Sequence, residues 1–251
     1  MTRGLYIAGT GMLVQRKKMD VLVNNIANAE TTGYKSGELV SRSFNDMLLS
    51  HINDPAVLNR SVGVGPLGPG VHIDEVIVDF QQGPLEETQR QEDLAIEGRG
   101  FFVVATPNGE RYTRDGGFFL SPMGYLVNCD GLPVMGDDGY IYAEGNISVD
   151  ANGHVTSDSG YGGRLRIVDF AELDSLRKEG NNLYTNYGGS PMTEAENATV
   201  RQGYLEGSNI DLAKTMVDMI QITRAHEIGQ RVIRMIDDTL GKAVNEVGRI
   251  R

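Results

Sequence analysis

The residues of this chain that could do chemistry fall into incomplete motifs. His226-Glu227 opens an H-E-x-x-H zinc motif, but position 230 is glutamine, so the second histidine ligand is missing. The acidic pairs Asp137-Asp138 and Asp237-Asp238 diverge on either a strand or a helix, so neither is an obvious acid–base pair. Cys129 is the single cysteine, which excludes an internal disulfide and a cysteine metal cluster. We therefore predict no metal site, no cofactor site and no catalytic residue.

One further pattern resembles a nucleotide site. Residues 61–70, S-V-G-V-G-P-L-G-P-G, match G-x-G-x-x-G. No clear strand precedes the match, and Pro66 and Pro69 stand where a helix should open, so we expect a linker or turn. A pair of carboxylates distant in sequence, such as Asp79 with Asp115, stays open. Such a pair would allow an enzymatic function, a hydrolase that uses carboxylates on a β-rich domain, and we keep this as the alternative to a structural role.

Charge limits the classes of partner. The chain of 251 residues has a net charge of −11. Residues 1–35 hold five Lys/Arg and two Asp/Glu, and residues 210–251 hold seven and six, so the middle carries −15. An acidic middle argues against nucleic acid. The apolar runs are too short to span a membrane, and we expect no cleaved secretory signal after Met1.

Helices at both ends must position whatever site exists. Residues 209–250 are free of proline, and Asn209 or Asp211 could cap the start. In this stretch, apolar residues at steps of three or four predict one face of a helix. Residues 5–26 have the same spacing, which predicts a second apolar seam that only the polar Gln15 interrupts. Whether the partner of each helix lies in the same chain or another stays open. The predicted assembly interface is Leu5, Ala8, Met12, Met19, Leu22, Ile26, Val232, Ile236, Leu240, Ala243, Val247 and Ile250.

The middle of the chain has the pattern of strands. Short apolar runs are separated by turn dipeptides at 108–109, 115–116, 130–131, 138–139 and 152–153, which suit tight hairpins. We predict an α+β fold, with a hairpin-rich antiparallel β middle domain flanked by N- and C-terminal helices that pair in a coiled-coil-like inner layer. Short helices are expected at 43–52 and 171–178. The predicted domains are 1–35 plus 209–251 (helical assembly), 36–70 (variable segment and linker) and 71–208 (β-rich outer domain).

Several segments together resemble the bacterial flagellar basal-body rod proteins. The run Asn24–Lys35, N-N-I-A-N-A-E-T-T-G-Y-K, is similar to the family's signature after the first helix. Residues 79–85, 93–104, 112–116 and 124–127 resemble its β-domain motifs, and residues 203–209 with 216–236 its C-terminal block. The distal rod protein and its proximal paralogue fit equally well. Within the signature, the residues that match are Asn24, Asn25, Ala27, Asn28, Thr31, Gly33, Tyr34 and Lys35.

The resemblance implies a structural role and not an enzymatic one. Such subunits leave the cell unfolded through the flagellar type III export apparatus, without a cleaved signal, and stack helically into the hollow rod that transmits torque from motor to hook. Expected partners are copies of the same chain and other rod, hook and ring proteins, with no membrane insertion. In the signature we expect Gly33 to adopt a positive φ, Tyr34 to pack and Lys35 to stay solvated.

Overall fold

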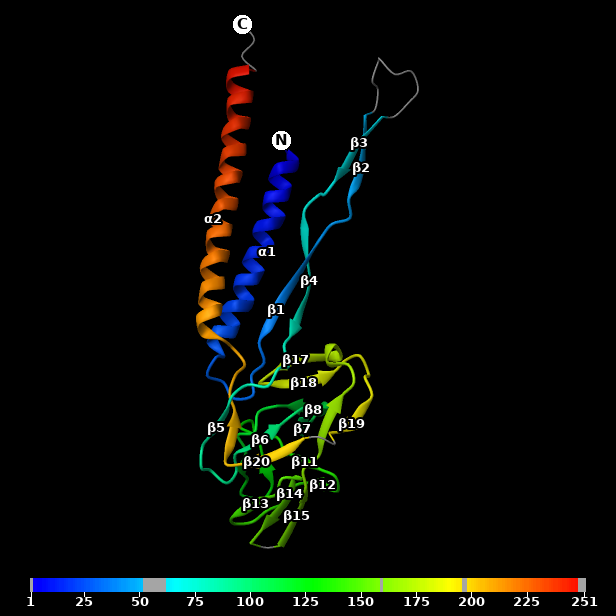
Figure 1. Ribbon diagram of the computed structural model, residues 1–251, viewed down its shortest axis with the longest axis vertical. Coiled ribbons are helices and arrows are strands. Elements are labelled where there is room, and N and C mark those ends of the chain that lie inside the picture. The colour runs from blue at the N-terminus through cyan, green and yellow to red at the C-terminus, as the bar shows by residue number, and fades with distance from the viewer. Residues whose placement is uncertain (1, 52–61, 159, 196–197, 248–251) are drawn as a thin grey trace. The chain divides into compact units, whose positions relative to one another are not determined.

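The computed structural model describes residues 2–51, 62–158, 160–195 and 198–247. The chain forms two compact units: unit 1 contains residues 1–24, 37–77 and 212–251, and unit 2 contains residues 25–36 and 78–211. The fold combines an N-terminal helix, a β-rich middle and a C-terminal helix, as predicted (Figure 1). Residues 25–36 thus belong with the β-rich unit and residues 37–77 with the helices, whereas the sequence-based division groups 1–35 with the C-terminal helix.

Two antiparallel helices lie side by side in unit 1. Helix α1 spans Thr2–Ala27, and helix α2 spans Leu212–Lys242 and continues into a π-helical turn at Ala243–Val247. A Cβ added at Gly4 would lie 3.3 Å from Ile236 Cδ1, and one added at Gly229 would lie 2.7 Å from Met12 Cγ. Gly4 of α1 lies near Ile236 of α2, and Met12 lies near Gly229, so the two helices run in opposite directions.

The strands of unit 1 correct two predictions. Strands β1 (Gly37–Ser43) and β4 (Val71–Val78) pair, and β2 (Met47–His51) pairs antiparallel with β3 (Val62–Leu67). The helix predicted over 43–52 is wrong, because Ser43 ends β1 and Met47–His51 forms β2. The linker predicted over 61–70 is also wrong for its first part. Among the described residues, β3 pairs with β2 alone, so the missing N–H of Pro66 breaks no second ladder there.

Unit 2 is built on a six-stranded sheet in the order β17-β18-β8-β7-β16-β19. Its central strand β7 (Phe101–Thr106) carries the continuous apolar run F-F-V-V. Phe102 and Val104 enter one hydrophobic core, while Phe101 and Val103 enter another. Because successive side chains of a strand point to opposite faces, an unbroken apolar run is what a strand between two cores requires. The flanking strands are β8 (Gly109–Thr113), β16 (Ile167–Phe170), β17 (Leu176–Gly180), β18 (Leu183–Asn186) and β19 (Met192–Glu194).

Smaller sheets complete unit 2. They comprise β5 (Leu85–Glu87) with β21 (Tyr204–Glu206), β6 (Leu94–Glu97) with β20 (Thr199–Gln202), β9 (Phe119–Leu120) with β10 (Leu126–Val127), β11 (Met135–Gly136) with β12 (Gly139–Tyr140), and the trio β13 (Ile147–Val149), β14 (His154–Ser157) and β15 (Gly160–Arg164).

The predicted turns hold with one exception, and Asp130-Gly131 lies in a turn closed by the antiparallel bridge between Val127 and Pro133. Asn108-Gly109, Asp138-Gly139 and Asn152-Gly153 connect antiparallel neighbours. Asp115-Gly116 does not form a hairpin; the backbone of Gly116 instead presses against the carbonyl of Leu94, leaving no room for a side chain. The helix expected at 171–178 is reduced to one 3₁₀ turn, Leu173–Ser175, before β17 begins.

Candidate assembly site

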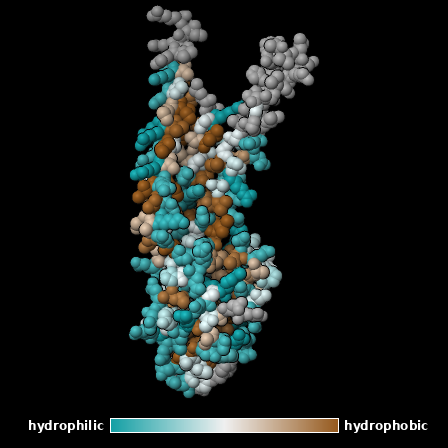
Figure 2. All heavy atoms as spheres, in the orientation of Figure 1, coloured by the Kyte–Doolittle hydropathy of each residue, from teal (hydrophilic) through white to brown (hydrophobic). Residues whose placement is uncertain are grey.

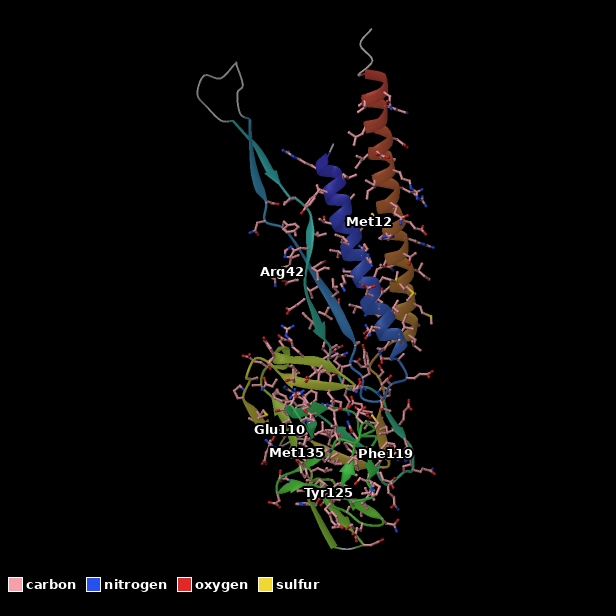
Figure 3. All side chains as sticks on the ribbon, turned by 180° about the vertical axis from the view of Figure 1, so that it is seen from behind. Met12, Arg42, Glu110, Phe119, Tyr125 and Met135 are labelled. Atoms are coloured by element: carbon pink, nitrogen blue, oxygen red, sulfur yellow. The ribbon has the colours of Figure 1, made fainter. Side chains whose placement is uncertain are left out.

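The predicted interface residues of α1 are partly covered. Ala8, Met12, Met19 and Leu22 are half-buried, as is Ile26 of unit 2, while Leu5 is 41% exposed. Met12 lies beside α2 of the same chain (Figure 3). The seam therefore has a partner within the chain along part of its length. Coiled-coil packing along the seam stays a prediction.

A second covered face of α1 escaped the sequence analysis. Val14 is the one apolar side chain of α1 that is buried among the described residues, and it lies off the predicted seam. A Cβ on Gly70 would touch Thr10, and a Cβ on Gly37 would lie 3.7 Å from Val21 Cγ1. Thr10, Val14 and Val21 share one helix face at spacings of four and seven. Helix α1 is therefore covered by α2 on one side and by the β1–β4 pair on another (Figure 1).

The predicted interface residues of α2 are likewise only half-buried. This holds for Val232, Ile236, Leu240 and Ala243, and Ile236 meets α1 at Gly4. The side chain of Val247 and all of Ile250 lie outside the described residues. No side chain of α2 is fully buried in the part of the helix that the structure describes.

Apolar residues also follow the sides of α2 that lie outside its contact with α1. At 100° per residue, Met216 and Ile220 fall roughly opposite Ile236 and Leu240, and Val217, Ile228 and Met235 fall on one flank of the helix. Each is more than half exposed, and Figure 2 shows hydrophobic surface along the helices of unit 1. We define the outer face of α2 by Met216, Val217, Ile220, Ile228 and Met235. Exposed apolar patches are typical of interaction surfaces.

The signature segment runs from the end of α1 into a turn of unit 2 whose last residues, 33–35, are buried. Asn25 is 5% exposed, and its Oδ1 accepts a hydrogen bond of 3.1 Å from the hydroxyl of Tyr34, which is itself 5% exposed. Asn28 Oδ1 accepts a bond of 3.4 Å from Thr31 Oγ1. The packing predicted for Tyr34 is confirmed. Two signature residues, Asn24 and Ala27, are exposed.

Gly33 has the backbone conformation that the sequence predicts. Its φ is +64°, and its N–H donates a bond of 2.7 Å to the carbonyl of Glu206. A Cβ at this position would lie 2.6 Å from the backbone carbon of Arg114 and closer still to Asp115. Any side chain here would therefore meet both backbone strain and a steric clash with β-domain backbone.

Lys35 is buried, so the prediction that it stays solvated is wrong. Its ammonium group donates to Glu206 Oε1 and, over 2.7 Å, to the carbonyl of Gln81. Arg114 Nη1 donates to Glu206 Oε2 over 3.2 Å, and the N–H of Gly83 donates to Glu206 Oε1 over 2.9 Å. The side chains of Lys35 and Glu206 are 0% exposed and that of Arg114 is 4% exposed. One carboxylate thus joins two buried cations, and we name Lys35, Glu206 and Arg114 the buried triad.

Burial dominates the electrostatics of the triad. It lowers the pKa of Lys35, and the ion pair with Glu206 opposes that shift. The pKa of Arg114 is lowered for the same reason, with the same opposition. The sequence analysis quoted the motifs that hold Glu206 and Arg114 but assigned neither a role. The signal that could have indicated the triad is the presence of Lys35, Arg114 and Glu206, charges of both signs, within three of the quoted motifs.

Lys178 covers the other side of the signature. Its ammonium group lies 3.8 Å from the ring centroid of Tyr34 and donates to the carbonyl of Lys35. Although much of the side chain is exposed, the protein around its charged end lowers the pKa of Lys178 to about 8 through desolvation.

The carboxylates considered for catalysis hold turns together. Asp79 Oδ1 accepts the N–H of Gln81 over 3.0 Å, and Asp115 Oδ1 accepts from Thr32 Oγ1 and the Gly117 N–H over 2.7 and 3.1 Å. Burial raises the pKa of Asp115 against these bonds. Among the described residues no His, Cys, Asp or Glu cluster could hold a metal ion. Within the same residues, no helix has the length and apolar character needed to cross a membrane.

Comparison with known families gives matches along much of the chain. Residues 5–35 match the family model of flagella basal body rod proteins. Residues 95–157 match the D1 domain of flagellar hook protein FlgE/F/G, and residues 201–246 match the C-terminal model of flagellar basal body rod FlgEFG proteins. The first match includes the signature turn with Lys35, and the last includes Glu206.

Individual relatives match over nearly their whole length. The flagellar basal-body rod protein FlgF of Caulobacter vibrioides is 34% identical, with all of both chains covered. The flagellar basal-body rod protein FlgG of Bacillus subtilis is 33% identical over 98% of this chain and 99% of its own. The flagellar hook-basal body complex protein FlhO of Bacillus subtilis is 31% identical over the full length of both.

Proposed function

This chain belongs to the family of flagellar basal-body rod proteins, and we propose that it self-assembles through its terminal helices into a hollow helical shaft that transmits torque from motor to hook. It is a structural subunit of the flagellar basal body and not an enzyme, since its family and relatives are rod proteins. The carboxylate-hydrolase alternative receives no support, and both carboxylates named for it serve as hydrogen-bond acceptors in turns.

The outer face of α2 is the observation that carries self-assembly. Helix α2 meets α1 on one side and still presents Val217, Ile220 and Ile228 to solvent at 53%, 53% and 58% exposure. Covering such side chains is worth roughly 1.5–3 kcal/mol each when complete. A second copy of the chain presents the same face and the exposed apolar residues of α1. Contacts between unlike faces produce a helical array when the rotation between neighbouring copies does not close into a ring.

Partners and location follow from the complex to which the family belongs. Relatives named for the hook-basal body complex imply other flagellar proteins as partners. The proposal adds a position across the periplasm or cell wall, neighbouring rod, hook and ring proteins, and passage through the type III export apparatus unfolded and without a cleaved signal. The predicted domain roles persist here, with helices as the inner assembly layer and the β-rich domain outside.

The test places a charge on the outer face of α2. Ile228→Asp should abolish pelletable polymer and swimming in soft agar, because an aspartate buried between subunits lacks a partner. The side chain is 58% exposed in the single chain, so helix content by circular dichroism should stay unchanged. Ile228→Leu keeps an apolar side chain and serves as the matched control. Normal polymerisation of Ile228→Asp would exclude this face as the assembly surface.

A further inference from the structure

Unit 2 exposes three tyrosines on one side of an antiparallel segment. Tyr125 and Tyr142 face each other across a β-bridge. Their ring centroids are 5.6 Å apart at 78°, and the rings of Tyr125 and Tyr140 are 6.2 Å apart at 82°. The alternate residues of the same segments, Leu126 and Ile141, are fully buried in the core. The segment is therefore two-faced, and we name Tyr125, Tyr140 and Tyr142 the tyrosine surface.

The tyrosine surface contributes little to the core of unit 2. Tyr125, Tyr140 and Tyr142 are 37%, 55% and 40% exposed, and Met123 beside them is 77% exposed. Figure 3 labels Tyr125 together with Phe119, which is 44% exposed on the neighbouring strand β9. Rigid aromatic side chains held by edge-to-face contacts are the residues that anchor protein interfaces. Burial within this chain does not explain why they gather here.

The surrounding charge selects the kind of partner. Residues 119–158 contain no Lys or Arg and six acidic residues, which are Asp130, Asp137, Asp138, Glu144, Asp150 and Asp158. Glu144 lies within the tyrosine surface, where its carboxylate accepts a hydrogen bond from the Tyr142 hydroxyl. Aromatic faces and carboxylates both attract cations, the first through the ring quadrupole and the second through charge.

A neighbouring contact shows how a cation would bind. The guanidinium carbon of Arg90 lies 4.8 Å from the ring centroid of Phe119, and Arg90 Nη1 lies 3.5 Å from Asp93 Oδ1. One arginine of this chain is thus held between an aromatic ring and a carboxylate at the edge of the surface. Tyr142 with Glu144 offers the same pair of groups with no cation of this stretch beside them.

We propose that the tyrosine surface docks a basic segment of a different protein, whose Lys or Arg side chains lie on the tyrosine rings and pair with Glu144. The surface is formed by unit 2 alone and uses neither terminal helix, so the inference goes beyond self-assembly. A saccharide or a second copy of this chain could also meet exposed tyrosines. The absence of Lys and Arg across residues 119–158 favours a basic protein over a neutral sugar, and the middle of a second copy, residues 36–209, is acidic as well.

Titration of the full-length chain with a labelled peptide tests the docking chemistry. The probe is a short peptide of alternating Arg and Gly, compared by fluorescence anisotropy with one of alternating Glu and Gly. Only the Arg peptide should bind, and Tyr140→Ala with Tyr142→Ala should weaken binding about tenfold. Tyr140→Phe keeps the ring and should bind normally, as should Tyr187→Ala, which removes an 82% exposed tyrosine outside the surface. Equal weakening by Tyr187→Ala, or equal binding of both peptides, overturns the proposal.

Photo-crosslinking in flagellated cells identifies the occupant. With p-benzoylphenylalanine in place of Tyr140, the proposal expects a crosslink to a Lys- or Arg-rich segment of another protein. A crosslink to a second copy overturns it, as does chito-oligosaccharide binding that Tyr140→Ala removes. Ile228→Asp separates this inference from the proposed self-assembly, because that variant should still bind the Arg peptide. If Ile228→Asp binds the Arg peptide and Tyr140→Ala does not, the outer face of α2 and the tyrosine surface act independently.

Discussion

The buried triad makes the sharpest prediction, through the charge of Glu206. Glu206→Gln preserves the shape of the side chain but removes the one negative charge between Lys35 and Arg114, both at most 4% exposed. Leaving a buried charge uncompensated costs about 3–5 kcal/mol. Lys35→Met should cost less, about 1–3 kcal/mol, since Arg114 still pairs with Glu206 and the desolvation of Lys35 disappears. The order of the two variants follows from the geometry and not from volume.

Urea unfolding of the full-length chain, followed by tyrosine fluorescence, measures both variants. Glu97→Gln is the matched control, because it neutralises a carboxylate of the same unit in an exposed ion pair with Arg201, 2.7 Å apart. It should cost less than about 1 kcal/mol.

A pH series separates charge from packing. Without Glu206 the pKa of Lys35 falls further below its ordinary 10.5, so the folded state binds fewer protons than the unfolded state over that window. Stability of Glu206→Gln should therefore rise relative to the native chain as pH increases from 7 to 10. A deficit below about 1 kcal/mol, or one that does not change with pH, would refute the reasoning about uncompensated charge.

Three further predictions use matched positions. Gly33→Ala should destabilise by more than about 2 kcal/mol from strain plus clash, whereas Gly131→Ala, at φ +77° with open space, should cost about 1 kcal/mol by the same urea assay; equal costs would exclude the clash. Because the folded pKa of Lys178 is about 8 against 10.5 unfolded, the native chain should gain stability over Lys178→Met from pH 8 to 10, and a constant difference would contradict that pKa. Val14→Ala should lower the thermal stability of α1 by about 1–2 kcal/mol and Leu13→Ala, at 61% exposure, hardly at all; the reverse order by circular dichroism would show that α1 is turned otherwise.

The sequence predicts elements whose signal is local. The periodic apolar residues of α1 and α2 place both helices within a few residues of their ends, and the positive φ of Gly33 follows from turn chemistry. The hairpin β2–β3 is missed because the Gly and Pro residues of β3 indicate a linker and the apolar spacing of β2 indicates a short helix when strand pairing is not known. Val14 is missed for the same reason, since its face of α1 is covered by strands β1 and β4.

Long-range burial is what the local pattern does not reveal. Lys35 reads as solvated because a buried lysine is rare without a partner. Its partner Glu206 lies 171 positions away. No residue near Lys35 in the sequence indicates that the carboxylate of Glu206 is its partner. The pairing of β21 with β5 in the folded chain positions that carboxylate.

The same separation has a consequence for the unfolded export that we propose. Within unit 2, the segment leaving α1 meets the segment entering α2: Gly33 donates to Glu206, and the Ser36 N–H donates to Asn209 Oδ1 over 2.8 Å. A contact between residues so far apart forms only after the cost of closing a long loop has been met. A chain threaded unfolded through a channel cannot form this junction until both ends of the β-rich unit have emerged. The charges of the buried triad are compensated only when Lys35, Arg114 and Glu206 are together. During the proposed export, we expect this to penalise states in which the turn is buried before Glu206 has emerged.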